Sequence, residues 1–254
     1  MIEARQLTNK IGGKTVVDEF SHCFETGKVT TIIGPNGAGK STILKSLAGI
    51  YPLKKHTVYI EDRDILSCSL KERAQLIGIV PQLTSITFPM TVMDYALLGR
   101  RPHLTWGVRE QDLKIVNKIL NSLEISDLSN SYLDEISGGE KQKASIARVL
   151  AQETSIVMMD EPISALDIRY QFEVLNLAKS LAKQEGYTVI LVLHDLELAA
   201  RFSDSIILVD NGKKLIAGPP EAVITKETMK RVYGVNAAIH SELHGIRISV
   251  LGPA

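Results

Sequence analysis

Gly34-Pro-Asn-Gly-Ala-Gly-Lys-Ser-Thr42 is the stretch that decides the fold of this chain. It fits the pattern G-x-x-x-x-G-K-[ST], with Gly34, Gly39, Lys40 and Ser41 at the fixed positions. Glycines lack a Cβ, so the backbone N–H groups of such a loop can approach phosphate oxygens. The lysine reaches the β- and γ-phosphates of a nucleotide, and the serine hydroxyl is a ligand for Mg2+. The sequence therefore predicts a phosphate-binding loop formed by Gly34, Pro35, Asn36, Gly37, Ala38, Gly39, Lys40, Ser41 and Thr42.

The residues on either side of this loop predict a strand and a helix. Residues 29–33 form a β-branched run before the loop, and residues 41–48 have helical spacing after it. The phosphates would then lie at a helix N-terminus, where the helix dipole favours anions. The alternative, an ordinary strand–turn–helix without a ligand, explains the pattern less completely than nucleotide binding does.

The rest of the chain alternates between strand-like and helix-like segments. Apolar runs predict strands at residues 2–7, 15–24, 57–60, 77–80, 155–159, 188–193, 205–209 and 213–217, with a final hairpin up to residue 250. Helical spacing predicts helices at residues 92–98, 111–123, 140–151, 169–182 and 226–232. This alternation indicates a largely parallel sheet covered on both faces. We expect one domain, residues 1–254, in which a core of residues 1–82 and 153–254 carries a helical subdomain of residues 83–152.

Composition limits the classes of protein to consider. The chain has 254 residues, 44% of them hydrophobic and 23% charged, as in ordinary soluble globular proteins. Lys plus Arg and Asp plus Glu number 29 each, which argues against a nucleic-acid binder with a large cationic face. No apolar stretch approaches the roughly 20 residues that span a bilayer, and the N-terminus has no secretory pattern. We expect a cytoplasmic protein in which Cys23 and Cys68 are reduced thiols, with Cys23 in the core.

Two carboxylates follow a predicted buried strand, in the stretch Ser155-Ile-Val-Met-Met-Asp-Glu-Pro162. In a phosphate site Asp160 would hold Mg2+ as the acidic partner of Ser41. Glu161, one residue later, is placed to orient and polarise an attacking water. An acidic pair after a strand is usually a polar turn, but together with the loop at residues 34–42 it favours hydrolysis.

A second glycine loop, Ser137-Gly-Gly-Glu-Lys141, precedes the helix predicted at residues 140–151. Serine followed by glycines at a helix start can bind an anion, or can simply cap the helix. Because this loop lies upstream of the strand that ends in Asp160 and Glu161, it is a more specific indication of a phosphate site than the residues Ser-Gly-Gly would be alone.

In this order along the chain, these stretches resemble the ATP-binding subunit of ATP-binding-cassette (ABC) transporters. Residues 34–42 resemble the Walker A loop, residues 156–160 the Walker B strand, and Ile136-Ser-Gly-Gly-Glu140 the signature sequence LSGGQ. Gln82 matches the Q-loop glutamine, Ser164-Ala-Leu-Asp167 the D-loop, and His194 the switch histidine. The resemblance extends over nearly the whole chain. It implies an α/β P-loop NTPase (ABC ATPase) core with a mixed sheet, an N-terminal antiparallel β subdomain and an inserted helical subdomain.

The resemblance also implies a mechanism that uses ATP and Mg2+, with Ser41, Gln82 and Asp160 around the metal. Two copies would dock head to tail, each ATP lying between the Walker A loop of one copy and the signature loop of the other. Glu161 would act as general base or water-positioning residue, and His194 would contact the γ-phosphate. Gln82 would sense the metal and the water and link the site to the membrane partner. Ser137, Gly138 and Gly139 would touch the γ-phosphate bound by Lys40 of the other copy, and Glu140 and Asp167 are also expected among the nucleotide-binding residues.

Three positions depart from the family pattern. Glu140 replaces the glutamine that ends the signature, and Ile163 stands where many members have threonine. The aromatic residue that stacks on adenine would fall near residue 11, which here is Ile11. We therefore expect loose selectivity for the base and an appreciable GTPase activity.

Weaker signals indicate which transporter branch the chain resembles. The segment from Phe88 to Arg100, continuing into Pro102-His103, lies where the family faces its membrane subunit, and its Gly-Arg-x-Pro-His pattern resembles importers of iron–siderophores, haem and cobalamin. Residues 218–225, 232–234 and 147–152 favour the same branch, and zinc or manganese importers are the next alternative. The implied partners are a second ATPase copy, integral-membrane permease subunits and, indirectly, a substrate-binding protein, but no nucleic acid. The protein would be peripheral, on the cytoplasmic face of the membrane.

Three other classes share part of the pattern. A small-molecule kinase has no use for Glu161 beside Asp160 or for residues 137–140. A DNA-repair or chromosome clamp would carry long coiled-coil heptads, and a paired-cassette translation factor would carry two Walker A loops, whereas this chain has neither.

Overall fold

The computed structural model describes residues 1–82, 89–164, 166–242 and 245–254, which form two compact units. The first unit comprises Met1–Ser67 and Leu175–Ala254, and the second comprises Cys68–Val174. Phe88 and Ala165, which fall within the predicted membrane-facing segment and the predicted D-loop, lie outside the described residues.

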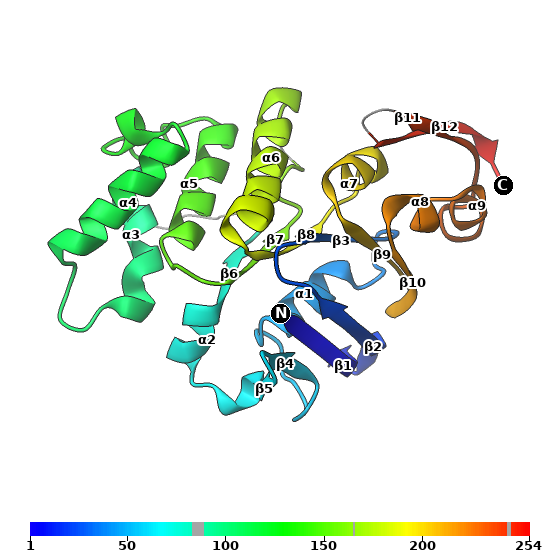
Figure 1. Ribbon diagram of the computed structural model, residues 1–254, viewed down its shortest axis with the longest axis horizontal. Helices are drawn as coiled ribbons and strands as arrows, with labels where there is room; N and C mark the ends of the chain where they lie inside the picture. The colour runs from blue at the N-terminus through cyan, green and yellow to red at the C-terminus, as the bar shows by residue number, and fades with distance from the viewer. Residues whose placement is uncertain (83–88, 165, 243–244) are drawn as a thin grey trace. The chain divides into compact units, whose positions relative to one another are not determined.

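The first unit contains an antiparallel sheet near the N-terminus, as expected (Figure 1). Its strand order is β2-β1-β4-β5. The strands are β1 (Ile2–Ile11), β2 (Lys14–Phe24), β4 (Val58–Ile60) and β5 (Arg63–Asp64). Buried side chains of this sheet include Leu7, Val17 and Phe20, because alternate residues of a strand face the core.

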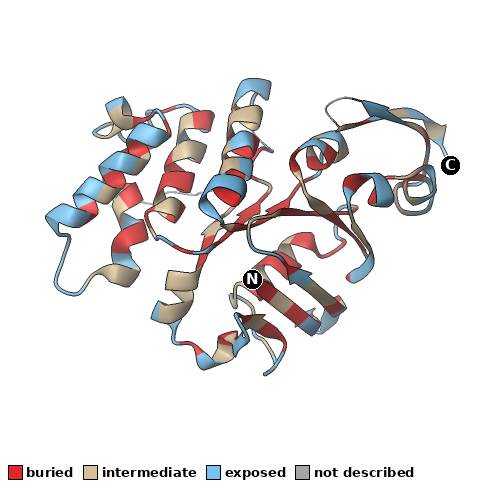
Figure 2. Cartoon of the chain, viewed as in Figure 1, coloured by how far each residue is buried: buried red, intermediate tan, exposed pale blue. Residues whose placement is uncertain are grey.

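The second group of strands in this unit has the order β10-β9-β3-β8. The strands are β3 (Val29–Ile33), β8 (Thr188–Val192), β9 (Ser205–Asp210) and β10 (Lys213–Gly218). β3 pairs in parallel with both β8 and β9, whereas β10 is antiparallel to β9, so the sheet is mixed as expected. Every residue of β3 and β8 is buried, which is typical of parallel strands covered on both faces (Figure 2).

Among the described residues, the first unit also contains a short 3-10 helix, four α-helices and a hairpin. They are η1 (Ile65–Ser67), α1 (Lys40–Leu47), α7 (Leu196–Phe202), α8 (Pro220–Val223), α9 (Lys226–Tyr233) and the pair β11 (Val235–Glu242) and β12 (Gly245–Pro253). The longest helix, α6 (Ile168–Glu185), begins in the second unit and ends in the first.

The second unit is mainly helical and also contains two parallel strands, β6 (Ile77–Val80) and β7 (Ile156–Asp160). Its helical elements are α2 (Leu70–Leu76), α3 (Val92–Leu97), η2 (Leu98–His103), α4 (Glu110–Ser122), η3 (Ser126–Leu128) and α5 (Gly138–Leu150). α3, α4 and α5 pack together, as the ribbon shows (Figure 1). Their apolar contacts bury side chains such as Val92, Val116 and Ile146.

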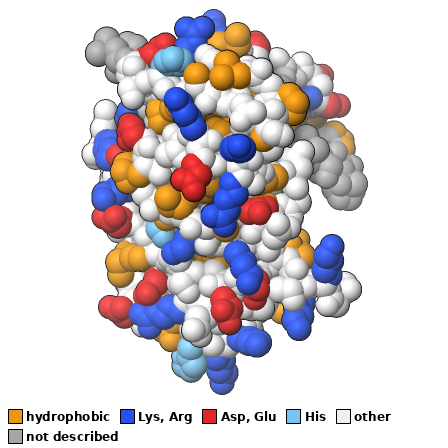
Figure 3. Space-filling model, turned by 90° about the vertical axis from the view of Figure 1, so that its right-hand side faces the viewer, with side chains coloured by type: hydrophobic (Ala, Val, Ile, Leu, Met, Phe, Trp, Pro, Cys, Tyr) orange, Lys and Arg blue, Asp and Glu red, His pale blue; other side chains and the backbone are white. Residues whose placement is uncertain are grey.

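One expectation about the core is wrong. Cys23 is exposed and Cys68 is buried, because in β2 the neighbouring Phe24 faces the core and places Cys23 on the opposite face. Acidic and basic side chains are interspersed on the face drawn in Figure 3, in keeping with the balanced charge of the sequence. Among the described residues, no helix combines the length and the apolar character needed to cross a membrane.

Candidate functional site

The loop at residues 34–42 is folded around its own lysine. Lys40 is only 5% exposed, and its Nζ donates hydrogen bonds to the carbonyl oxygens of Gly34 at 2.8 Å and Pro35 at 2.9 Å. α1 begins at Lys40, so the first N–H groups of the helix, which have no intrahelical acceptor, belong to the loop. An ammonium group and helix N–H groups are together a site for anions.

Two glycines of this loop have no room for a side chain. Gly34 has φ 153°, and a Cβ there would lie 2.1 Å from the carbonyl oxygen of Val209. Gly39 has φ 97°, and a Cβ there would lie 2.7 Å from the carbonyl oxygen of Val16. The pattern G-x-x-x-x-G is therefore needed to fit the loop between β9 and the start of β2.

His194 leaves the sheet at the same edge as this loop. In the parallel register Ile32 of β3 pairs with Val192 of β8, so Gly34 and His194 each come two residues after a paired position. His194 is exposed, and Asp195 after it caps α7 by accepting a hydrogen bond from the Leu198 N–H at 2.8 Å. The first unit thus brings His194 to the edge that carries the phosphate-binding loop.

In the second unit, Gln82 and Glu161 meet at the corresponding ends of β6 and β7. Val80 pairs with Met159 in a parallel register, so both following segments leave at one edge. Gln82 Nε2 donates a hydrogen bond of 2.5 Å to Glu161 Oε2. The Gln82 side chain thus uses its amide NH2 group to contact the Glu161 carboxylate, and its amide oxygen is not used in this bond.

Asp160 and Glu161 are adjacent but have different environments. Asp160 is 1% exposed at the end of β7, whereas Glu161 follows the strand in a turn with φ 49°. A left-handed conformation in a residue other than glycine is unfavourable and is typical of functional sites. The turn is held by the Ser164 N–H, which donates to the Glu161 carbonyl oxygen at 3.3 Å.

Asp167 lies immediately before α6. Its Oδ1 accepts a hydrogen bond from the Tyr170 N–H at 3.1 Å, which is a helix-capping contact. The backbone of the preceding turn is also fixed, because Gln171 Nε2 donates to the Leu166 carbonyl oxygen at 3.0 Å.

Ser137 and Glu140 form a reciprocal cap at the start of α5. The Ser137 N–H and hydroxyl donate to Glu140 Oε2 at 2.8 and 2.7 Å, and the Glu140 N–H donates to Ser137 Oγ at 3.4 Å. This is a capping box, a motif that takes either glutamate or glutamine at the position of Glu140. Gly139 is packed against Tyr170, since a Cβ on Gly139 would lie 2.7 Å from that ring. Ser137 and Gly138 are exposed at the helix N-terminus.

The hydrogen bond from Ser137 lowers the pKa of Glu140 below its usual value of 4.5. Because the folded pKa lies below the unfolded one, the carboxylate stabilises the fold above pH 4.5 and this contribution is lost as the pH falls through the folded pKa. We expect Glu140→Gln to keep the cap and to weaken the loss of stability in acid. Urea unfolding between about pH 3 and 6 measures this change. Glu185→Gln, at the exposed end of α6, is the control, and an equal effect of both substitutions would contradict the prediction.

The structure therefore gathers the predicted residues into local groups. In the first unit, the loop at residues 34–42 and His194 share one strand edge. In the second unit, Gln82 contacts Glu161 beside Asp160, Asp167 caps α6, and Ser137 to Glu140 begin α5. All the proposed metal donors (Ser41, Gln82 and Asp160) can supply oxygen, the donor that Mg2+ prefers.

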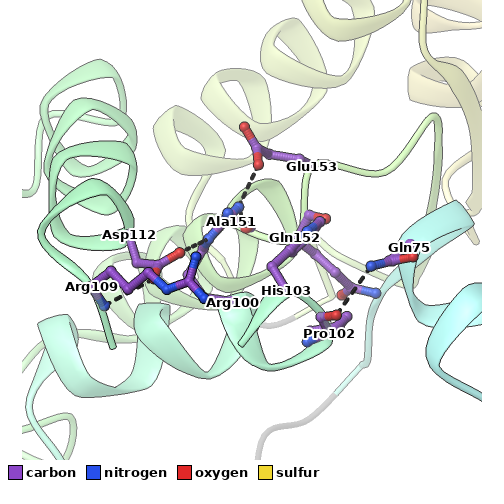
Figure 4. Close-up of polar contacts among 9 residues, drawn as sticks. All are labelled: Gln75, Arg100, Pro102, His103, Arg109, Asp112, Ala151, Gln152 and Glu153. Carbon is purple, nitrogen blue, oxygen red and sulfur yellow. Dashed lines mark hydrogen bonds and ion pairs between the residues drawn. The ribbon is translucent and has the colours of Figure 1, made fainter. Parts of the chain in front are cut away.

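Sequence reasoning missed one polar cluster in the second unit. Arg100 is 5% exposed and forms buried contacts with Asp112 and with the end of α5 (Figure 4). The sequence pattern predicted that the segment containing Arg100 faces a membrane subunit, and it gave no indication of these internal contacts. The local sequence holds two adjacent arginines between Gly99 and Pro102, and nothing in it distinguishes the buried Arg100 from the exposed Arg101.

Comparison with known proteins identifies the family. Residues 17–164 match the ABC transporter family. The petrobactin import ATP-binding protein YclP of Bacillus subtilis is 35% identical over 95% of this chain and 96% of its own length. The hemin import ATP-binding protein HmuV of Thermobifida fusca is 38% identical over 95% of this chain and 84% of its own length. The dimeric structure of MJ0796, a bacterial ABC transporter cassette, has a TM-score of 0.77 and 26% identity over 87% of this chain and 99% of that one. This chain belongs to the ABC transporter family and is one of its ATP-binding subunits.

Proposed function

We propose that this protein is the ATPase subunit of an importer that takes up an iron chelate, a siderophore or haem complex, or cobalamin through a membrane permease. The proposal rests on the Gln82–Glu161 contact of 2.5 Å beside the buried Asp160, in a chain that also carries a phosphate-binding loop. The choice of branch is supported by two relatives whose names specify petrobactin and hemin import.

In the proposed reaction, ATP phosphates bind to the N–H groups of the loop at residues 34–42 and to the Lys40 ammonium. Glu161 orients a water molecule and accepts its proton, while Gln82 holds the Glu161 carboxylate in position. His194, at the same strand edge as the loop, contacts the γ-phosphate. Mg2+, held by Ser41, Asp160 and the amide oxygen of Gln82, would supply charge neutralisation on the phosphates.

A second copy completes each site in this proposal. Ser137 and Gly138 are exposed at the N-terminus of α5, and helix N–H groups there can approach a phosphate bound to another molecule. The next two residues of α5 are Gly139 and Glu140. Asp167 lies just before α6. All three would belong to the same nucleotide-facing surface. The dimeric assembly of the MJ0796 cassette, at 26% identity, supports this arrangement.

The helical segment, residues 83–152, is proposed as the subdomain that contacts the permease, with residues 1–82 and 153–254 as the nucleotide-binding core. The protein would then lie on the cytoplasmic face of the membrane, held there by permease subunits and coupled through them to a substrate-binding protein. No nucleic-acid partner is proposed.

The proposal is tested by co-expression with candidate permease subunits, followed by reconstitution into vesicles. We expect the chain to co-purify with its permease, and we expect its ATPase rate to rise when a binding protein loaded with an iron–siderophore, haem or cobalamin is added. Binding proteins loaded with zinc or manganese are included as the alternative. Stimulation only by those metals would overturn the proposed branch, and absence of any permease association would overturn the transport function.

The base of the nucleotide is expected to be selected loosely. Ile11, at the tip of the β1–β2 hairpin, is 42% exposed, and Val16 of the same hairpin packs against Gly39 of the phosphate-binding loop. An aliphatic side chain at the expected adenine position offers apolar contact but no stacking surface or base-edge hydrogen bond.

We therefore predict that GTP is hydrolysed with a kcat/KM within about a hundredfold of that for ATP, because discrimination by apolar contact alone is weak. Steady-state kinetics with both nucleotides measure the ratio. Ile11→Tyr is the matched variant and should increase the affinity for both purine nucleotides through stacking. An ATP preference well above a hundredfold in the unmodified chain would disprove loose selection.

A further inference from the structure

The segment η2, Leu98–His103, lies against the end of α5 within the second unit (Figure 4). Arg100 is its central residue and is 5% exposed. Its Nε donates to Asp112 Oδ1 at 2.9 Å, and its Nη1 donates to the Ala151 carbonyl oxygen at 2.7 Å and to Glu153 Oε2 at 2.5 Å. One guanidinium therefore joins η2, the start of α4 and the residues that follow α5.

This arrangement depends on arginine in particular. The planar guanidinium has donors in fixed directions, so it can reach three acceptors on two other segments at once, whereas a lysine ammonium acts as a point charge. Asp112 is also fixed, because its Oδ2 accepts a hydrogen bond from the Arg109 N–H at 3.0 Å. A buried charge left without its partners is costly, so the three segments are held at one spacing.

η2 also approaches α5 and the residues that follow it at two further points. A Cβ on Gly99 would lie 1.9 Å from the Arg148 carbonyl oxygen, so only glycine allows this approach. His103 Nε2 lies 2.8 Å from the Gln152 carbonyl oxygen, at hydrogen-bonding distance.

Gln152 carries the connection onward to the strand that leads to Gln82. Its Nε2 donates to the carbonyl oxygens of Ala74 and, at 2.9 Å, Ile77, where α2 ends and β6 begins. Gln75 of α2 in turn donates to the Pro102 carbonyl oxygen at 3.1 Å. Side-chain hydrogen bonds consequently join three places: the end of α5, η2 and the start of β6. We call the residues that make these bonds the Arg100–Gln152 cluster (Arg100, Asp112, Gln152, Glu153, His103 and Gln75).

The two elements joined by this cluster carry proposed site residues at their other ends. α5 begins at Ser137, and β6 continues into Gln82, which contacts Glu161. We propose that Arg100 is a positioning residue that fixes α5 relative to β6, so that Ser137 and the Gln82–Glu161 pair hold a single geometry when two copies close on ATP. The inference rests on the proposed dimeric ATPase mechanism.

Nucleotide binding and dimer closure use different parts of the chain in this mechanism. Nucleotide binding to a single copy uses the loop at residues 34–42, which belongs to the first unit and not to the unit that contains the cluster. ATP-dependent closure of the dimer and hydrolysis use Ser137, Gln82 and Glu161, all in the second unit. Loss of the cluster should therefore impair closure and kcat but not binding.

The test is Arg100→Lys in a Glu161→Gln background, where bound ATP is retained. We expect the protein concentration at the midpoint of ATP-driven dimerisation to rise about tenfold, as measured by sedimentation. In the monomer we expect the Kd for a fluorescent ATP analogue to change less than about twofold, with one nucleotide still bound per chain. In the chain with Glu161 intact, kcat should fall while the KM for ATP changes little.

Two further variants keep the result interpretable. Glu153→Gln removes one charged acceptor that is half exposed, and should shift the dimerisation midpoint in the same direction by a smaller factor. Arg101→Gln changes the exposed neighbour of Arg100 and should leave the dimerisation of the isolated chain unaltered.

The outcomes distinguish the inference from the proposed function. If the Glu161→Gln chain with Arg100 intact does not dimerise on ATP, the proposed mechanism fails and the inference fails with it. If that chain dimerises and Arg100→Lys behaves like Arg101→Gln, the inference alone is overturned. A fall in nucleotide stoichiometry in step with dimerisation would also overturn it, because Arg100 would then serve only to keep the chain folded.

Discussion

Glu161→Gln is expected to lower kcat for ATP by about 10²–10⁴-fold, the usual contribution of a general base. The glutamine is nearly isosteric, so the turn after β7 and the contact with Gln82 should persist, but the amide cannot accept the proton of the attacking water. ATP should therefore stay bound and the dimer should stay closed. Single-turnover hydrolysis and size-exclusion chromatography in the presence of Mg-ATP measure the two consequences separately.

The control for this substitution is Glu110→Gln, which removes an exposed carboxylate at the start of α4. It should leave kcat unchanged, since its ion pair with Lys114 is on the surface and such pairs contribute little. Hydrolysis by Glu161→Gln at a rate near that of the unmodified chain would remove Glu161 from the mechanism. Loss of nucleotide binding by the same variant would show that Glu161 contributes to ATP binding rather than to the hydrolytic step.

The parts of the fold that the sequence predicts are those governed by local patterns. β3 and β6 have the predicted bounds, because short β-branched runs closed by glycine or proline leave little choice of conformation. The contact between Gln82 and Glu161 also follows once β6 and β7 pair in parallel, since both residues come just after paired positions. The family resemblance supplied the roles of these residues, which spacing alone does not.

The parts that the sequence does not predict depend on contacts between distant residues. The Arg100 guanidinium binds the Ala151 carbonyl oxygen across 51 positions, and no local pattern shows that this arginine is internal. α2 and α7 were also missed, because each has only seven residues and is bounded by a capping side chain rather than by a long periodic pattern. The bond between Ser137 and Glu140, by contrast, was within reach, since S-x-x-E is the sequence signature of a capping box.

Ser137→Arg is expected to abolish ATP hydrolysis while the same subunit still binds nucleotide. The large side chain would occupy the exposed start of α5, where the proposed dimer brings the phosphates of the other copy's ATP. The substitution also removes the helix cap, which costs about 0.5–2 kcal/mol and leaves the chain folded. Ser137→Ala removes the cap without adding bulk, and should lower kcat much less than the arginine does.

Mixing two inactive variants tests whether the site is shared between copies. Lys40→Ala disables the phosphate-binding loop but keeps Ser137, whereas Ser137→Arg keeps the loop and disables the start of α5. A dimer of one variant with the other contains one site built from two intact halves, so the mixture should regain part of the ATPase activity that neither variant has alone. Hydrolysis by the mixture at the level of the separate variants would show that each chain forms its site by itself, because only a shared site can be restored by exchange of subunits.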